Sequence, residues 1–103
     1  MKDNHYEAKD YTYLRNLSDK GESLLKAHHS GAFRYILHNV YDAIYRFDSS
    51  FGLKLYNNMK QFEIHLIDDN DESVYDKALI RYQELMNEYF QGVIVDINEH
   101  HGF

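Results

Sequence analysis

Histidine is the residue type in this chain best suited to chemistry, because imidazole nitrogens bind transition metals and transfer protons near neutral pH. The chain has 7 histidines among 103 residues. His38 with Asp42, and His65 with Asp68, lie about one helical turn apart, so each pair shares one face of a helix. A metal site needs further ligands from facing helices, directed inward. Both pairs lie on predicted outer faces, so we predict no metal site and no cofactor.

The remaining chemical signals in the sequence are weak. His28 falls on an apolar stripe, and we interpret it as a core or boundary histidine. The dipeptides at positions 28–29 and 100–101 are too short for metal-binding tracts. The absence of cysteine excludes disulfides, thiol catalysis and zinc fingers. No glycine-rich phosphate loop or nucleophile elbow occurs. We therefore predict that the protein is not an enzyme and has no catalytic residues.

One pair of residues carries the alternative to that prediction. Arg34 and His38 share a helix face, and the pair is similar to the Arg-then-His pair of the HEPN ribonucleases, which are also helical bundles. The spacing departs from the family pattern, because only three residues intervene where the family has a longer spacer. We interpret the likeness as coincidental. The resemblance implies an alternative to a non-catalytic function: a helical-bundle enzyme or metal site of HEPN-like ribonuclease type using Arg34, His38 and Asp42.

Charge is distributed unevenly along the chain, whose formal net charge is −6. Residues 1–62 contain nine basic and seven acidic side chains, whereas residues 63–103 contain two basic and ten acidic ones. Nucleic acids require clustered Lys and Arg, so we predict no direct nucleic acid binding. A protein partner with a basic surface fits this charge. The acidic turn at residues 68–72 also fits N-terminal capping of the following helix.

Tyrosine completes the predicted interface, because exposed tyrosines bury a large area at low entropic cost. The chain has ten tyrosines, and some fall outside the apolar stripes. The residues that we predict to bind a partner are Asp68, Asp69, Asp71, Glu72, Asp76, Glu84, Glu88, Tyr35 and Tyr45.

Four amphipathic segments with a period of about 3.6 residues must position these side chains. Residues 5–29 form one long helix, or two bent near residues 18–21, with Gly21 on the inner face and Ser30-Gly31 as the turn. The apolar stripe expected for this segment is Tyr6, Tyr13, Leu17, Leu24 and His28, widened by Leu14 and Leu25.

The next segments are read in the same way. Residues 32–47 give the clearest helical pattern, with Phe33, Ile36, Leu37, Val40, Ile44 and Phe47 on one face. Residues 48–50 provide an N-cap for a third helix that ends near residue 67, although a β-hairpin turning at residues 57–58 stays open. A fourth helix begins near Glu72 and has Gly92 as a candidate end. Residues 93–95 then either continue this helix or form a short extended piece, and a frayed tail follows from residue 98.

These segments predict an all-α fold, a small antiparallel four-helix bundle whose first helix is long or bent, with a short irregular C-terminal tail. The length fits a single helical domain over residues 1–103. The absence of cysteine, of a signal peptide and of a long apolar run predicts a cytoplasmic protein that does not enter a membrane.

The function predicted from these features is a non-catalytic protein-binding module. It is a small acidic inhibitor or immunity-type protein that docks on a basic, nucleic-acid-handling or defence/toxin protein. The architecture resembles that of bacteriocin immunity proteins, in bundle type and size only. A composition without Pro or Trp and rich in Tyr is compatible with an AT-rich phage or bacterial genome. A homo-oligomeric structural module, such as a homodimer, is a further alternative.

Overall fold

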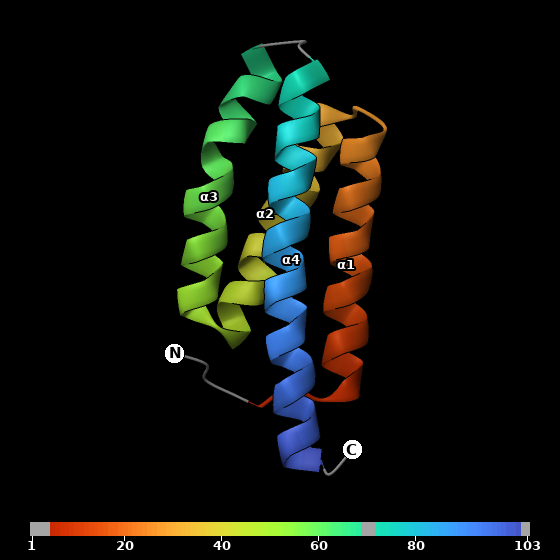
Figure 1. The fold of residues 1–103 in the computed structure, drawn as a ribbon, viewed down its shortest axis with the longest axis vertical. Helices are drawn as coiled ribbons and strands as arrows, with labels where there is room; N and C mark the ends of the chain where they lie inside the picture. Colours follow the sequence, from red (N-terminus) through yellow and green to blue (C-terminus); the bar gives the residue numbers. More distant parts are fainter. Residues whose placement is uncertain (1–4, 69–71, 102–103) are drawn as a thin grey trace.

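The protein is an antiparallel bundle of four helices (Figure 1). The computed structural model describes residues 5–68 and 72–101, except for the side chains of Ile67, Asp68 and His101. The helices are, in chain order, α1 (Ala8–Lys26), α2 (Ser30–Phe47), α3 (Ser49–Asp68) and α4 (Glu72–His101).

Each helix of the bundle packs on two others. The packed pairs are α1 on α2, α2 on α3, α3 on α4 and α4 on α1. Helices α2 and α4 therefore face each other across a diagonal, and α4 lies in front of α2 in Figure 1. The predicted four-helix bundle is confirmed. None of the described helices combines the length and the apolar character that crossing a lipid bilayer requires.

The first helix begins with a capping box, in which the Glu7 backbone N–H donates to Asp10 Oδ2 at 2.9 Å. It continues without interruption through residues 18–21, so the alternative of two bent helices is wrong. The inner face of α1 consists of Leu14, Ser18, Gly21 and Leu25. The predicted stripe was rotated too far, because Tyr13 is 59% exposed. Gly21 does allow a close approach, since a Cβ there would lie 2.7 Å from the hydroxyl oxygen of Tyr82.

The first turn lies earlier than predicted. Residues 27–29 connect α1 to α2, and Ser30 and Gly31 already belong to α2. His28 has a φ of 60°, the left-handed conformation that commonly ends helices. Its side chain is exposed and its ring stacks on Tyr75 at 4.2 Å between ring centroids. The interpretation of His28 as a core or boundary histidine is therefore wrong.

The second and third helices agree closely with the sequence pattern. The predicted inner residues of α2 are buried, except that Phe47 is only partly buried. Asp48 alone separates α2 from α3, and its Oδ1 accepts a hydrogen bond from the Phe51 backbone N–H at 3.0 Å. This is the predicted N-cap. Residues 52–67 lie within α3, so the hairpin alternative is excluded.

The fourth helix is longer than predicted and runs through Gly92 to His101. Val93 and Ile97 are buried one turn apart, and their packing continues the inner face of α4 beyond the glycine. Gly92 as the end of the helix is therefore wrong, and so is a frayed segment over residues 98–101. The last turns of α4 extend beyond the other helices at the end of the bundle where α1 begins (Figure 1).

Candidate functional site

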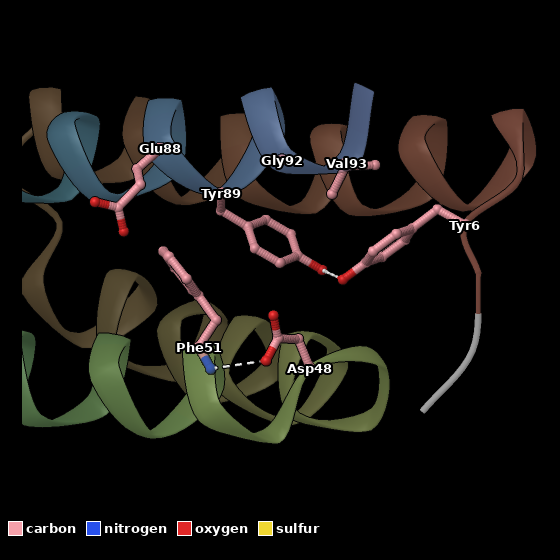
Figure 2. A pocket seen from close by; sticks show the side chains of 7 residues that line it. All are labelled: Tyr6, Asp48, Phe51, Glu88, Tyr89, Gly92 and Val93. Carbon is pink, nitrogen blue, oxygen red and sulfur yellow. Dashed lines mark hydrogen bonds between the residues drawn. The ribbon is translucent and has the colours of Figure 1, made fainter. Parts of the chain in front are cut away.

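A pocket of about 320 Å³ opens at the end of the bundle where α3 begins (Figure 2). It is bounded by the segment before α1, by the start of α3 and by α4. Its lining consists of Tyr6, Asp48, Phe51, Glu88, Tyr89, Gly92 and Val93. The volume suits one large side chain or a small ligand.

Local chemistry explains how these side chains come to line the pocket. Asp48 is held in place because its carboxylate caps α3. The hydroxyl groups of Tyr6 and Tyr89 share a hydrogen bond of 2.7 Å, which joins the segment before α1 to α4. Gly92 leaves room beside them because it has no side chain. Figure 2 shows the Asp48 carboxylate next to this tyrosine pair, while Glu88 lies beyond the Phe51 ring.

The pocket combines negative charge with aromatic surface. Asp48 and Glu88 supply the two carboxylates, and Phe51, Tyr6 and Tyr89 supply the rings. This combination favours a cationic group, which carboxylates bind through charge-assisted hydrogen bonds and aromatic rings attract through their faces. The protein already places a cation at the rim. Lys54 Nζ lies 2.6 Å from Glu88 Oε2 and 5.6 Å from the centroid of the Phe51 ring.

The two phenols in the pocket wall remain protonated at neutral pH. Burial raises the pKa of Tyr6 to about 12, an effect that the hydrogen bond with Tyr89 reduces and the charge of Asp48 reinforces. Burial, and then the hydrogen bond with Tyr6, raises the pKa of Tyr89 as well. Neutral phenols donate and accept hydrogen bonds but do not act as bases at neutral pH. The two phenols are therefore suited to hydrogen bonding rather than to proton abstraction.

The acidic residues predicted to bind a partner lie mainly along α4. Glu72, Asp76, Glu84 and Glu88 are all exposed on this helix, and Glu88 lines the pocket. Asp68 is the last residue of α3, and its side chain lies outside the described part of the chain. Asp69 and Asp71 also lie outside the described residues.

The two tyrosines predicted to join this interface lie elsewhere. Tyr35 and Tyr45 are exposed by 71% and 50%, as expected, but both belong to α2. The tyrosines and the acidic residues of α4 therefore lie on helices that occupy diagonal positions in the bundle. The sequence analysis does not predict the aromatic lining of the pocket, because the apolar stripe of residues 5–29 places Tyr6 in the core and no motif singles out Phe51 or Tyr89.

The Arg34–His38 face contains a second group of polar side chains. His38 Nε2 lies 2.8 Å from Oε1 of Glu63, a buried carboxylate on α3, rather than pairing with Asp42. The two atoms are in close contact, but Glu63 Oε1 makes no well-aligned hydrogen bond to a described residue. An imidazole beside a buried carboxylate is an arrangement that general bases use. However, no side-chain hydrogen bond joins Arg34 to His38 among the described residues, although the two lie one turn apart on α2.

Tyr41 lies beside this group, and its substitution tests the cost of burying an unpaired hydroxyl. Its ring meets that of His38 edge to face at 5.2 Å, and its buried hydroxyl has no hydrogen-bond partner among residues 5–68 and 72–101. Burying an unpaired hydroxyl is unfavourable. We expect Tyr41→Phe to raise the free energy of unfolding by about 1 kcal/mol. Urea denaturation at neutral pH measures this change.

A matched substitution serves as the control for Tyr41→Phe. The Tyr82 hydroxyl is also buried, but it donates a hydrogen bond of 2.8 Å to the Ser18 carbonyl oxygen. Tyr82→Phe should therefore lower the free energy of unfolding by about 1 kcal/mol, the opposite sign for the same chemical change. Equal destabilisation by both substitutions would mean that the Tyr41 hydroxyl is hydrogen-bonded in solution.

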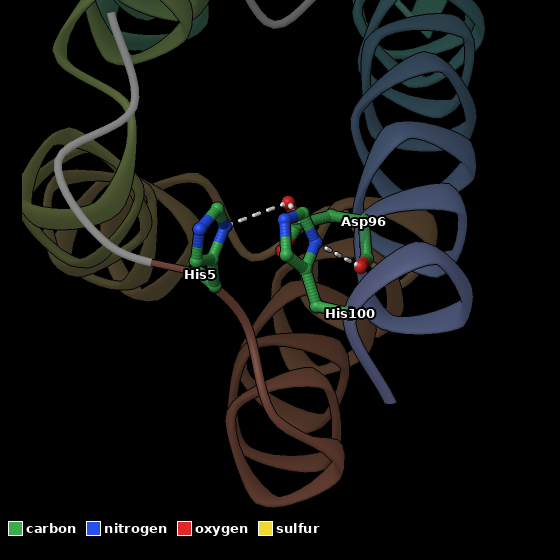
Figure 3. Close-up of side chains that lie close together, drawn as sticks. All are labelled: His5, Asp96 and His100. Carbon is green, nitrogen blue, oxygen red and sulfur yellow. Dashed lines mark hydrogen bonds and ion pairs between the residues drawn. The ribbon is translucent and has the colours of Figure 1, made fainter. Parts of the chain in front are cut away.

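Three residues that no sequence motif groups together lie close to one another at the end of the bundle where α1 begins. His5, Asp96 and His100 place one potential metal-binding atom each within 4.8 Å of one another (Figure 3). The sequence contained a signal for part of this group, because Asp96 and His100 lie one helical turn apart. This pair shares a helix face only because α4 continues past Gly92, its candidate end.

The chain matches no protein-family model, and no curated protein or solved structure is similar enough to match it.

Proposed function

We propose that this protein is a non-catalytic protein-binding module that docks on a basic protein surface and accepts a Lys or Arg side chain of its partner in the pocket at the start of α3. The observation that carries this proposal is the pairing of two carboxylates, Asp48 and Glu88, with the aromatic walls of Phe51 and Tyr89. A cation entering this pocket meets opposite charge and ring faces together.

The charge along the rest of α4 supports the same function. Three further carboxylates, those of Glu72, Asp76 and Glu84, are exposed along α4. Residues 63–103 contain ten acidic side chains against two basic ones. Such a field speeds the encounter with a basic surface, while a buried anchor side chain in a pocket supplies most of the affinity. The biological setting that we propose is that of a small phage or bacterial inhibitor or immunity-type protein acting on a nucleic-acid-handling, defence or toxin protein.

Lys54 already pairs with Glu88 and so competes with a partner's cation for this carboxylate. Both side chains are about half exposed, and exposed ion pairs contribute at most about 1 kcal/mol. A cation from the partner can therefore displace Lys54 from Glu88 at small cost. It follows that Lys54→Gln should strengthen the binding of a basic ligand.

We expect a short peptide with one Lys and one Arg among neutral residues to bind the pocket, and nuclear magnetic resonance titration measures the affinity. The combined substitution Asp48→Asn and Glu88→Gln should weaken binding by about tenfold or more. Asparagine at position 48 keeps the N-cap of α3, so the fold is retained. Rising salt concentration should weaken binding to the parent protein, because exposed charges are screened.

Glu84→Gln is the matched control, because it removes one negative charge from the same helix outside the pocket. It should change the affinity by less than about twofold, since an exposed charge contributes little. A second control is the same peptide with its lysine acetylated and its arginine replaced by glutamine. The proposal is wrong if this neutral peptide binds as tightly, or if the pocket variant binds the basic peptide as the parent does.

A further inference from the structure

We propose that His5, Asp96 and His100 bind a divalent transition-metal ion of the zinc type, which joins the segment before α1 to the last turns of α4. This site lies outside the pocket and does not depend on the proposed function. Two imidazoles and one carboxylate form a ligand set typical of zinc, and such sites leave a further position for water. Nitrogen donors disfavour Mg²⁺ and Ca²⁺, which prefer oxygen ligands.

The carboxylate of the site is held in position by the backbone. Asp96 is only 4% exposed, and its Oδ2 accepts a hydrogen bond of 2.7 Å from the Tyr6 backbone N–H. The other oxygen, Oδ1, faces the two imidazoles. A hydrogen bond to the second oxygen of a metal-binding carboxylate orients the ligand in advance. Tyr6, the residue after His5, therefore holds in place the Asp96 carboxylate that would bind the metal together with His5.

The distances between the donor atoms fit a bound ion. Asp96 Oδ1 lies 3.3 Å from His5 Nδ1 and 3.5 Å from His100 Nδ1. A tetrahedral zinc ion bound at about 2.0–2.1 Å by each donor holds the donor atoms about 3.3–3.4 Å apart. Both separations are close to this spacing, and all three potential donor atoms lie within 4.8 Å of one another.

The imidazole rings need one adjustment. They are stacked, with centroids 3.6 Å apart and planes inclined by 27°, whereas an imidazole nitrogen binds metal in the plane of its ring. The His5 side chain is 61% exposed and precedes α1, so its ring can turn about its side-chain torsions. His100 Nδ1 also lies 2.9 Å from the Asp96 carbonyl oxygen, and metal binding would replace this contact.

Calorimetric titration of the full chain with ZnCl₂ tests the site. We expect one ion to bind per chain, and at a hundredfold excess over Kd we expect the Tm to rise by about 10 °C or more. His5→Gln and His100→Gln should each weaken binding by about tenfold or more. Both histidines are exposed, so far-ultraviolet circular dichroism should show an unchanged helix content in these variants. MgCl₂ should leave the Tm unchanged.

His29→Gln is the matched control, since it replaces another exposed histidine in the turn between α1 and α2, at the far end of α1. It should bind zinc as the parent does. The inference is overturned if zinc leaves the Tm unchanged, if both site variants bind zinc with the parent affinity, or if His29→Gln weakens binding as much as they do. A response to MgCl₂ as large as the response to zinc would also overturn it, because the nitrogen donors would then not select the ion.

Discussion

Raising the pH from about 10 to about 12 should lower the free energy of unfolding of this protein by several kcal/mol, because buried phenols keep their protons in the folded state. Burial raises the pKa of both Tyr6 and Tyr82 from 10.0 to about 12. Burial raises the pKa of Tyr41 and Tyr89 in the same direction. In the unfolded chain these phenols lose their protons near pH 10, where the folded protein still binds them.

The direction of this pH dependence follows from the number of protons that the folded and unfolded states bind. Below the unfolded pKa both states are protonated, and the stabilisation is fully present. Between about pH 10 and 12 the unfolded state binds fewer protons, so the free energy of unfolding falls as the pH rises. The shift from 10.0 to about 12 corresponds to about 3 kcal/mol for each of Tyr6 and Tyr82. Together these losses are comparable with the whole stability of a small domain, about 5–15 kcal/mol.

Urea denaturation followed by circular dichroism, at pH values from about 8 to 12, measures this loss. Tyr82→Phe removes one buried phenol and should make the dependence on pH shallower. Tyr35→Phe, which replaces a tyrosine that is 71% exposed, is the matched control and should leave the slope as it is in the parent. A free energy of unfolding that stays constant up to about pH 12 would contradict the burial of these hydroxyl groups.

Gly52→Ala should lower the free energy of unfolding by about 2–3 kcal/mol, although alanine is the better helix former. Gly52 lies in the first turn of α3, directly against α2. A Cβ at this position would lie 2.8 Å from Tyr45 Cα and 2.9 Å from Tyr45 Cβ. The obstacle includes backbone, which cannot turn aside as a flexible side chain can. Because only Asp48 separates α2 from α3, the two helices cannot move apart at this corner without breaking the N-cap of α3.

Gly92→Ala is the matched control for this prediction. Gly92 lies within α4, and a Cβ there would meet no atom within 4 Å. We expect a gain of about 0.5–1 kcal/mol, because alanine loses less backbone entropy on folding. Thermal unfolding measures both changes, and each kcal/mol corresponds to about 4–8 °C in Tm. If Gly52→Ala were as stabilising as Gly92→Ala, the close contact between α2 and α3 would be wrong.

The sequence by itself determined the helices and most of the core. Apolar residues recur in residues 32–47 with the helical period, and the side chains of Phe33, Ile36 and Ile44 are buried as this pattern requires. The N-cap at Asp48 was also readable, because a carboxylate accepts the unpaired N–H groups of the first turn. These features depend on interactions within a few residues, which the order of the amino acids specifies directly.

Tertiary packing decided where the helices end and which side of α1 faces inward. A glycine within a helix costs only about 1 kcal/mol, and burial of Val93 and Ile97 offsets that cost, so α4 continues past Gly92. Tyr13 and Leu14 are adjacent, and both side chains have a large apolar surface. Only the neighbouring helices determine that Leu14 is buried and Tyr13 is exposed.

The two proposed sites depend on tertiary structure even more strongly. The pocket brings Tyr6 together with Asp48 and Glu88, and the metal site brings His5 together with Asp96 and His100. In an antiparallel bundle of four helices, the last helix ends where the first begins. The predicted topology therefore indicates only that the start of the first helix and the end of the last lie at the same end of the bundle. The particular contacts follow from the angle and rotation of each packed helix, which the spacing of residues along the chain does not encode.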